Sequence, residues 1–175
     1  MKQLSSKKMV IMALFIALTC VATMTIQIPS PMSGYVNLGD CLVLLGAWIL
    51  GPLSGGASAA IGSALADLLT GYTHYALGTF VIKGAMAWVA GCFFYHARHK
   101  NNKASALPAQ IFGGLLAEVI MVLGYFAYAG LLLGNGLAAA SSIPGNVIQG
   151  IFGILSAVLL MQLLEKSKAL SFLSN

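Results

Sequence analysis

Long apolar segments dominate this sequence, and short stretches rich in glycine, proline or charge separate them. An apolar run of about twenty residues is long enough to cross the ~30 Å hydrocarbon core of a bilayer as a helix. The expected helices cover about residues 9–28, 40–50, 54–70, 77–96, 107–133 and 144–164 of one membrane domain, residues 1–175. The second is short, so it must be tilted, cross a thinned region or extend into the preceding loop. We therefore expect an all-α integral membrane protein with six transmembrane helices.

Charged residues are too scarce to cover a surface that faces water. They make up 7% of the chain and hydrophobic residues make up 59%, whereas soluble domains carry about a quarter of their residues as charged. The exterior is therefore expected to face lipid. The net charge of +5 does not indicate binding to nucleic acid, because the cations lie between apolar segments and follow the positive-inside bias of membrane proteins.

The distribution of lysine and arginine predicts the topology. Cations precede the first segment, separate the fourth from the fifth and follow the sixth, whereas the loops after the first, third and fifth segments contain none. The residues concerned are Lys2, Lys7, Lys8, Arg98, Lys100, Lys103, Lys166 and Lys168. Six spans therefore place both termini on the cytoplasmic side. The start of the chain resembles a signal peptide, but its apolar run is long and no small-residue cleavage site follows, so we interpret it as a retained helix.

No motif predicts catalysis, a cofactor or a metal site. Cys20, Cys41 and Cys92 are isolated and show no metal-ligand spacing, so we interpret them as small buried hydrophobic residues. The sequence contains no GxxxxGKS/T phosphate-binding loop and no HExxH or GxSxG motif. We therefore do not expect an enzyme, and any energy for transport would come from another chain.

Four ionisable side chains lie within the apolar segments, where each needs a partner or a function. They are Asp40, Asp67, Lys83 and Glu118. Counted from the same face of the membrane at about 1.5 Å per residue, Asp67 and Lys83 lie at similar depth. We expect these two to form a pair, which is either structural or in contact with a polar ligand. Glu118 could bond Gln149, Lys83 or a ligand.

The loops and helix ends on the predicted outer side are rich in aromatic, amide and charged groups, a combination typical of a site for a small polar ligand. The candidate binding residues are Tyr35, Asn37, Asp40, Asp67, Tyr72, His74, Tyr75, Lys83, Glu118, Tyr125, Asn146 and Gln149. The alternative for the tyrosines is an aromatic belt at the membrane interface. For Asn37 and Asp40 the alternative is a helix cap, and for His74 it is a surface position.

Four short motifs in the first half of the chain together resemble the S components of energy-coupling factor (ECF) vitamin transporters. They are residues 34–40 (GYVNLGD), 51–52 (GP), 66–72 (ADLLTGY) and 79–84 (TFVIKG). The last two expected helices match that family only in length and character. The resemblance implies a six-helix substrate-capture subunit in a bacterial plasma membrane, with an outward-facing site closed by the loop between the first two helices.

The same resemblance implies partners. In this family two ATP-binding subunits and a membrane T subunit supply the energy, and the S component topples in the membrane to carry its vitamin inward. Ala13 and Ala17 match the Ala-x-x-x-Ala motif that contacts the T subunit. Within the family the sequence most resembles the subgroup predicted to take up hydroxymethylpyrimidine or vitamin B6 compounds. An alternative function is a self-contained transporter or channel that forms oligomers through Gly130 and Gly134.

Overall fold

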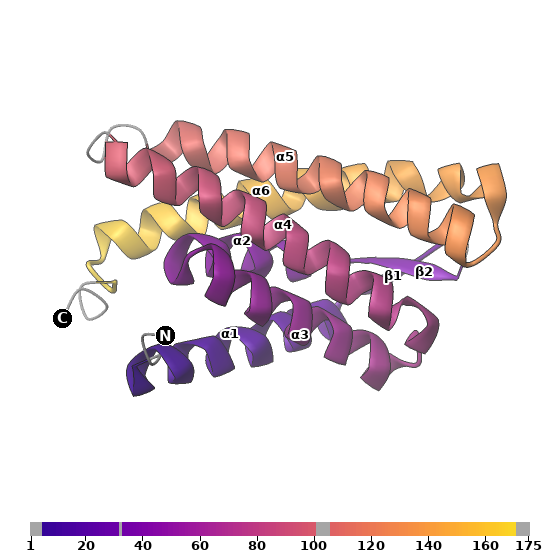
Figure 1. Cartoon of the computed structure of the whole chain (residues 1–175), viewed down its shortest axis with the longest axis horizontal. Helices are drawn as coiled ribbons and strands as arrows, with labels where there is room; N and C mark the ends of the chain where they lie inside the picture. The colour runs from indigo at the N-terminus through magenta and orange to yellow at the C-terminus, as the bar shows by residue number, and fades with distance from the viewer. Residues whose placement is uncertain (1–4, 32, 101–105, 171–175) are drawn as a thin grey trace.

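The computed structural model describes residues 5–31, 33–100 and 106–170, which form six α-helices and one short hairpin (Figure 1). The helices are α1 (Ser6–Thr25), α2 (Gly39–Leu50), α3 (Pro52–Thr70), α4 (Thr73–Lys100), α5 (Ala106–Ala127) and α6 (Ile143–Lys166). A π-helical turn, Tyr128–Leu132, extends α5, and a 3-10 helix, Gly136–Ser142, leads into α6. Each apolar segment of the sequence overlaps one of these helices.

The first apolar segment does not stay helical to residue 28 as expected. Helix α1 ends at Thr25, and the chain then forms an antiparallel hairpin of β1 (Gln27–Ser30) and β2 (Gly34–Asn37). Pro29 explains the early end, because a proline lacks the N–H of a helical hydrogen bond and disfavours helical backbone at the residue before it. The fold is therefore not entirely helical, since it includes one two-stranded sheet.

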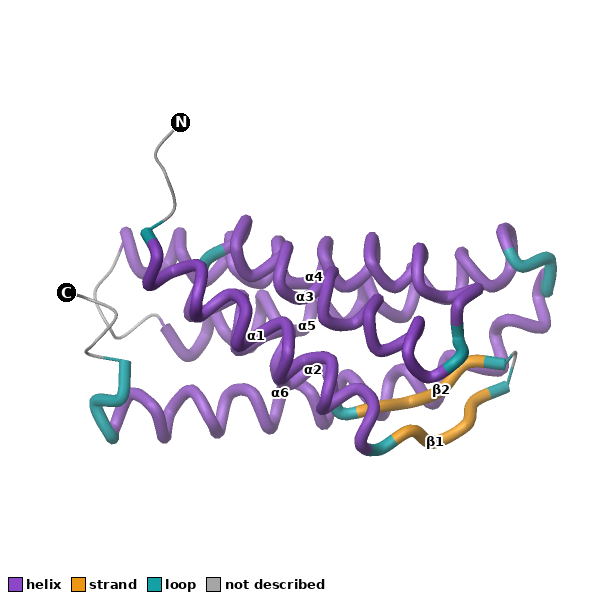
Figure 2. The backbone as a smooth tube through the Cα atoms, turned by 90° about the horizontal axis from the view of Figure 1, so that it is seen from below, coloured by secondary structure: helices purple, strands orange, loops and turns teal. Residues whose placement is uncertain are grey.

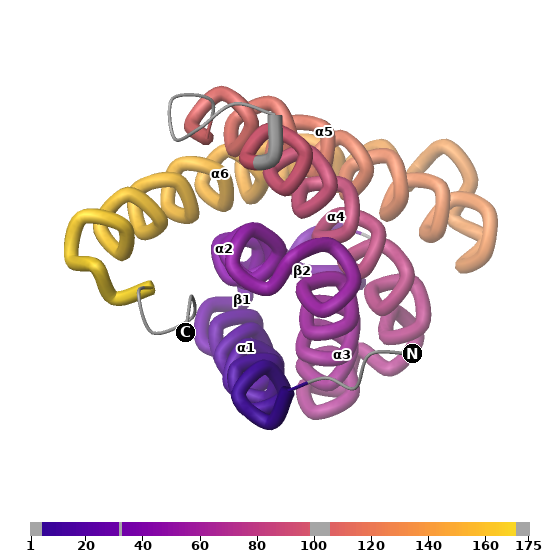
Figure 3. The backbone as a smooth tube through the Cα atoms, turned by 60° about the vertical axis from the view of Figure 1, so that its left-hand side comes forward, coloured from indigo at the N-terminus to yellow at the C-terminus, as the bar shows by residue number. Residues whose placement is uncertain are grey.

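Helix α2 is the central element of the bundle and contacts α1, α3, α4 and α6 (Figure 3). Its side chains Val43, Leu44 and Ala47 are almost completely buried. Its twelve residues span only about 18 Å at the rise of an α-helix, well below the ~30 Å of a hydrocarbon core. Gly51, with a φ of 83°, then turns the chain into α3. This turn packs closely against α4 at Gly91, where a side chain on α4 would collide with Pro52.

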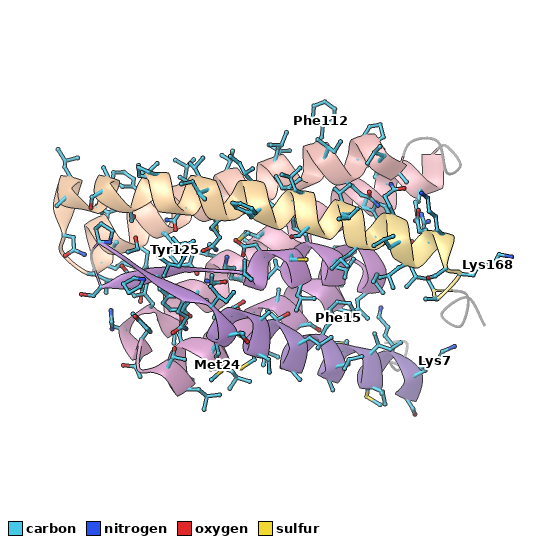
Figure 4. The ribbon with its side chains drawn as sticks, turned by 180° about the vertical axis from the view of Figure 1, so that it is seen from behind. Lys7, Phe15, Met24, Phe112, Tyr125 and Lys168 are labelled. Atoms are coloured by element: carbon cyan, nitrogen blue, oxygen red, sulfur yellow. The ribbon has the colours of Figure 1, made fainter. Side chains whose placement is uncertain are left out.

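The bundle has two chemically different ends. The basic end carries the start of α1, the end of α4, the start of α5 and the end of α6 (Figures 1 and 2). The cations at this end whose side chains are described are Lys7, Lys8, Arg98, Lys166 and Lys168, of which Figure 4 labels the first and the last. Lys2 and Lys103 lie outside the described residues. The opposite end, the hairpin end, carries the β1–β2 hairpin, the α3–α4 turn and residues 128–142.

The surface between the two ends is apolar. In the described part of the chain, four helical segments are long and apolar enough to cross a membrane: Ser6–Thr25, Thr73–Arg98, Ala106–Leu132 and Gly136–Lys166. Large hydrophobic side chains such as Leu77, Phe112 and Leu155 are exposed, and Figure 4 shows Phe112 pointing away from the bundle. Such an extended apolar exterior is stable when lipid covers it. The chain is therefore a multi-pass membrane protein.

Close packing between α2 and α3 depends on glycine. A Cβ atom at Gly55 would lie 2.6 Å from the Cα and 2.9 Å from the backbone nitrogen of Ala47. Small residues allow helix backbones to approach closely, and in lipid this close packing is a main source of helix association. Because the contact is with backbone atoms, a larger residue could fit only if the two helices moved apart.

Gly55→Ala should therefore destabilise the folded protein by about 1–3 kcal/mol, the usual cost of overpacking, although alanine gains ~1 kcal/mol in helix propensity. The measurement is the midpoint of thermal unfolding in detergent. Leu53→Ala is the matched control, since Leu53 lies on the same helix and is 79% exposed, and it should leave the midpoint nearly unchanged. A Gly55→Ala midpoint as high as that of the control would contradict the packing argument.

Candidate ligand-binding site

A polar cavity lies at the hairpin end, between the hairpin and helices from both halves of the chain. It is lined by Thr23, Ser30, Pro31, Gly34, Tyr35, Asn37, Ser63, Asp67, Tyr75, Thr79, Lys83, Tyr125, Ser142, Asn146 and Gln149. The empty space between its atoms, including the open mouth, is about 530 Å³. The centre of a water molecule can occupy about 40 Å³ of this space. One water needs roughly 10–15 Å³ of such space. With the side chains as they stand, the cavity suits a small molecule.

Lys83 of α4 forms a buried ion pair with Asp40 of α2, so the expected pairing of Lys83 with Asp67 is wrong. Lys83 is 2% exposed and Asp40 is 0% exposed. Asp40 lies in the first turn of the central helix, which packs directly against α4. Depth in the membrane placed Asp67 at the level of Lys83, but depth does not determine the direction in which a side chain points around the bundle.

Gln149 of α6 extends the network around this ion pair. Its Nε2 donates a hydrogen bond to Asp40 Oδ2 at 2.6 Å, and its Oε1 accepts one from the backbone N–H of Asn37 at 2.7 Å. The side-chain oxygen of Asn37 accepts a further hydrogen bond from the N–H of Gly39, two residues along the chain, at 2.8 Å. One amide group therefore joins the hairpin, α2 and α6.

Asp67 of α3 is hydrogen-bonded to the hairpin, and among the described residues Lys83 and His74 act on it only from beyond ion-pair distance. The hydroxyl of Tyr35 donates a hydrogen bond to Asp67 Oδ1 at 2.5 Å. Burial raises the pKa of the Tyr35 phenol above its usual value, and the negative charge and hydrogen bond of Asp67 raise it further. Tyr35 therefore stays protonated near neutral pH and remains a donor to Asp67.

Several residues that line the cavity carry a buried polar atom without a hydrogen-bond partner among the described residues. These atoms are Thr23 Oγ1, Ser30 Oγ, Ser63 Oγ and Asp67 Oδ2. The three hydroxyl residues are absent from the residues predicted from the sequence. Serine and threonine are common in membrane helices, where they can bond to the backbone of their own helix, so the sequence carries no signal that marks these as site residues.

Tyrosines form one wall of the cavity. Tyr75 and Tyr125 meet edge to face with ring centroids 6.2 Å apart, and Figure 4 places Tyr125 toward the hairpin end. The hydroxyl of Tyr125 donates a hydrogen bond to Thr79 Oγ1 at 3.0 Å. The Lys83 ammonium lies 5.7 Å from the centroid of the Tyr125 ring, within the range of a cation–π contact. This wall combines flat apolar rings with fixed polar groups, as ligand sites commonly do.

The structure brings most of the predicted site residues to the cavity and leaves four outside its lining. Asp40 lies behind Lys83 and Gln149. The ring of Tyr72 contacts that of Tyr35 in a tilted arrangement with centroids 4.5 Å apart, and His74 is exposed. Glu118 is buried behind Asp40, where a Cβ atom at Gly153 would touch both carboxyl side chains, and neither of its oxygens has a hydrogen-bond partner among the described residues.

Because the ion pair is buried, removal of one partner should destabilise the fold. Lys83→Met and Asp40→Asn should each lower the free energy of unfolding by about 3–5 kcal/mol, because each leaves the other charge buried without its partner. The double variant should recover at least about 1 kcal/mol relative to the sum of the two. Thermal unfolding in detergent measures all three. Strict additivity of the two single effects would show that the pair has no energetic coupling.

Comparison with known proteins places these features in a family. The family model described as the S component of ECF-type riboflavin transporters matches residues 3–166. An uncharacterized protein from the gap 3′ region of Pyrococcus woesei is 39% identical over 136 residues, which cover 77% of this chain and 86% of that protein. The thiamine precursor transporter HmpT of Lactococcus lactis subsp. cremoris (strain MG1363) is 27% identical over 167 residues, which cover 94% of this chain and 92% of that protein.

A solved S component of a bacterial ECF transporter has a similar fold. The TM-score is 0.66 at 20% sequence identity, and the match covers 91% of this chain and 96% of the solved one. At this identity the likeness concerns the fold alone, whereas the family model covers nearly the whole sequence. The chain therefore belongs to the S-component family of ECF-type riboflavin transporters and is a substrate-binding subunit of a membrane transporter.

Proposed function

We propose that this S component captures a small water-soluble vitamin or vitamin precursor at the hairpin end and delivers it to the cytoplasm. The observation that carries the proposal is the cavity, where polar side chains from both halves of the chain surround one space and several lack a hydrogen-bond partner in the part of the chain that the structure describes. Polar groups at membrane depth are costly and are kept mainly where they have a function. A ligand with several hydrogen-bonding groups would satisfy them.

The leading substrate candidates are hydroxymethylpyrimidine and vitamin B6 compounds, each a single heteroaromatic ring with a hydroxyl group. The Lactococcus relative is named as a thiamine precursor transporter, which supports a ring of this kind. The size of the cavity also supports a single-ring ligand, because only a small part of the cavity can hold the centre of a water molecule. Riboflavin, the vitamin in the family description, has three fused rings and a polyol chain, and it would require the hairpin and the lining side chains to move apart.

We further propose six transmembrane helices, with the basic end and both termini on the cytoplasmic side of a bacterial plasma membrane. The gathering of Lys7, Lys8, Arg98 and Lys166 at one end supports this orientation, because cytoplasmic loops carry an excess of lysine and arginine. In this orientation the cavity opens to the outside. The short helix α2 would be shielded from lipid by its neighbours.

Transport would depend on partner subunits, namely a membrane T subunit and two ATP-binding subunits. Leu44 and Met86 lie one helical turn from Asp40 and Lys83 toward the basic end, and both are completely buried. This apolar layer supports a role in which the chain binds its ligand and other subunits supply the movement and energy. Ala13 and Ala17 are exposed on α1, where their small side chains suit close approach of a helix of the T subunit.

The alternative, a self-contained oligomeric transporter, was suggested by two glycines, Gly130 and Gly134, and both have a role within one chain. A Cβ atom at Gly130 would lie 3.0 Å from the carbonyl oxygen of Gly136 in the same chain. Gly134 has a φ of 75° in the turn that follows α5. Both glycines are therefore explained by packing and turn geometry within one chain. Flux in liposomes that contain this chain alone would favour the alternative.

The purified chain should bind one candidate vitamin tightly without ATP. Native mass spectrometry of the protein as purified would detect a bound vitamin by its mass, and isothermal titration calorimetry would measure the affinities for hydroxymethylpyrimidine, pyridoxine and riboflavin. Asn146→Ala removes an amide that lines the cavity and should weaken binding by about tenfold, the value of one hydrogen bond. A folded sample that binds none of a full vitamin panel would rule out the proposed function.

The docking role of α1 makes a separate prediction. Ala13→Leu and Ala17→Leu should leave vitamin binding unchanged but reduce uptake by cells that contain the partner subunits, because the larger side chain prevents close helix contact. Ala127→Leu is the matched control, since Ala127 is an exposed alanine on α5, and it should affect neither measurement. Loss of vitamin binding in the α1 variants would contradict this division of roles.

A further inference from the structure

Two charged side chains line the cavity among the described residues, and they differ in how far they are already satisfied. The positive charge of Lys83 is opposed by Asp40, to which its Nζ donates, and the same Nζ lies 3.2 Å from the sulfur of Met121. Asp67 has no such counter-charge in contact. Its Oδ1 accepts from the neutral hydroxyl of Tyr35, and the Thr79 hydroxyl lies near the same carboxylate. By hydrogen-bond geometry its Oδ2 has no partner among the described residues.

The unsatisfied atoms of the residues that line the cavity belong to α1, α3 and the hairpin. Thr23 of α1 and Ser63 and Asp67 of α3 supply three of the four unpartnered atoms, and these residues are 3%, 1% and 2% exposed. Ser30 of the hairpin supplies the fourth. Buried polar atoms in native proteins nearly always have partners. Four orphan atoms in the lining of one cavity therefore indicate the chemical complement of a ligand, with a carboxylate among hydroxyl groups.

A carboxylate accepts hydrogen bonds and attracts positive charge, and hydroxyl groups both donate and accept. A ligand group that faces Asp67 must therefore donate, as an exocyclic amine or a protonated ring nitrogen does. A phosphate or carboxylate group on the ligand would be repelled by Asp67. It would find little compensation in Lys83, because the ammonium already contacts Asp40.

We propose that Asp67 is the specificity-determining acceptor of this site, so that the cavity selects a ring with an amine or protonated nitrogen and rejects phosphorylated or carboxylated forms of the same ring. Tyr35 is a positioning residue, because its hydrogen bond to Oδ1 fixes the carboxylate and leaves Oδ2 free for the ligand. This inference rests on the proposed capture of a small vitamin precursor, and it names the chemistry that the site distinguishes.

The test compares three probes by calorimetry: an aminopyrimidine with a hydroxymethyl group, its phosphate ester and the analogue in which hydrogen replaces the amine. The native chain should bind the first at least about tenfold to a hundredfold more tightly than either of the others, the value of a charge-assisted hydrogen bond. Asp67→Asn should lose a similar factor for the aminopyrimidine but little for the analogue without the amine. The ratio between the affinity for the free ring and the affinity for its phosphate ester should also be smaller in this variant than in the native chain.

Ser58→Ala is the matched control, since Ser58 lies on the same helix, is buried and bonds the backbone of α1 outside the cavity. It should behave as the native chain with all three probes. If Asp67→Asn does not fold, the probe series on the native chain still decides. Equal binding of the free ring and its phosphate ester, or of the rings with and without the amine, would overturn the inference and leave the proposed function intact. Binding of a different vitamin but of no pyrimidine would also overturn the inference and leave the proposed function intact. Failure to bind any vitamin would overturn both the inference and the proposed function.

Discussion

The ion pair between Lys83 and Asp40 is the constraint on which the arrangement of the site depends. It joins two helices at the base of the polar cavity, and Gln149 adds a third helix and the hairpin to the same cluster. A buried charge is tolerated only when it is paired and its remaining hydrogen-bonding groups are satisfied. The partners of Asp40 therefore determine how α2, α4 and α6 sit relative to one another, and the cavity is the space that remains above them.

The helices of this fold could be predicted from the sequence because lipid makes apolar length a strong signal. The hairpin could not, because its two four-residue strands lie among apolar residues and carry no alternating pattern long enough to distinguish them from a loop. Only Pro29 indicated that the first helix had to end early. Because charged residues are scarce, Lys83 and the carboxylates stood out in the sequence. The sequence did not indicate which carboxylate pairs with Lys83.

The lining of the cavity was predicted in part. Tyrosines and amides near the expected helix ends are conspicuous in an apolar chain, and eight of the predicted residues line the cavity. Thr23 and Ser63 were missed because an isolated hydroxyl in a membrane helix is ordinary, and their significance depends on helices that come together only in the fold. Glu118 shows the opposite limitation. Its charge made it prominent in the sequence, yet it faces Gly150 and Gly153 of α6 and not the cavity.

The unequal lengths of the helices affect how the protein sits in a bilayer. Helix α3 has 19 residues and α4 has 28, so they extend about 28 Å and 42 Å along their axes, and both expose leucine or phenylalanine to lipid. A bilayer of uniform thickness cannot match both heights at once, and each ångström of hydrophobic mismatch costs a fraction of a kcal/mol. Helix α4 therefore either tilts or leaves its basic last turn, which contains Arg98, in water, whereas α3 is short enough to remain within the hydrocarbon core.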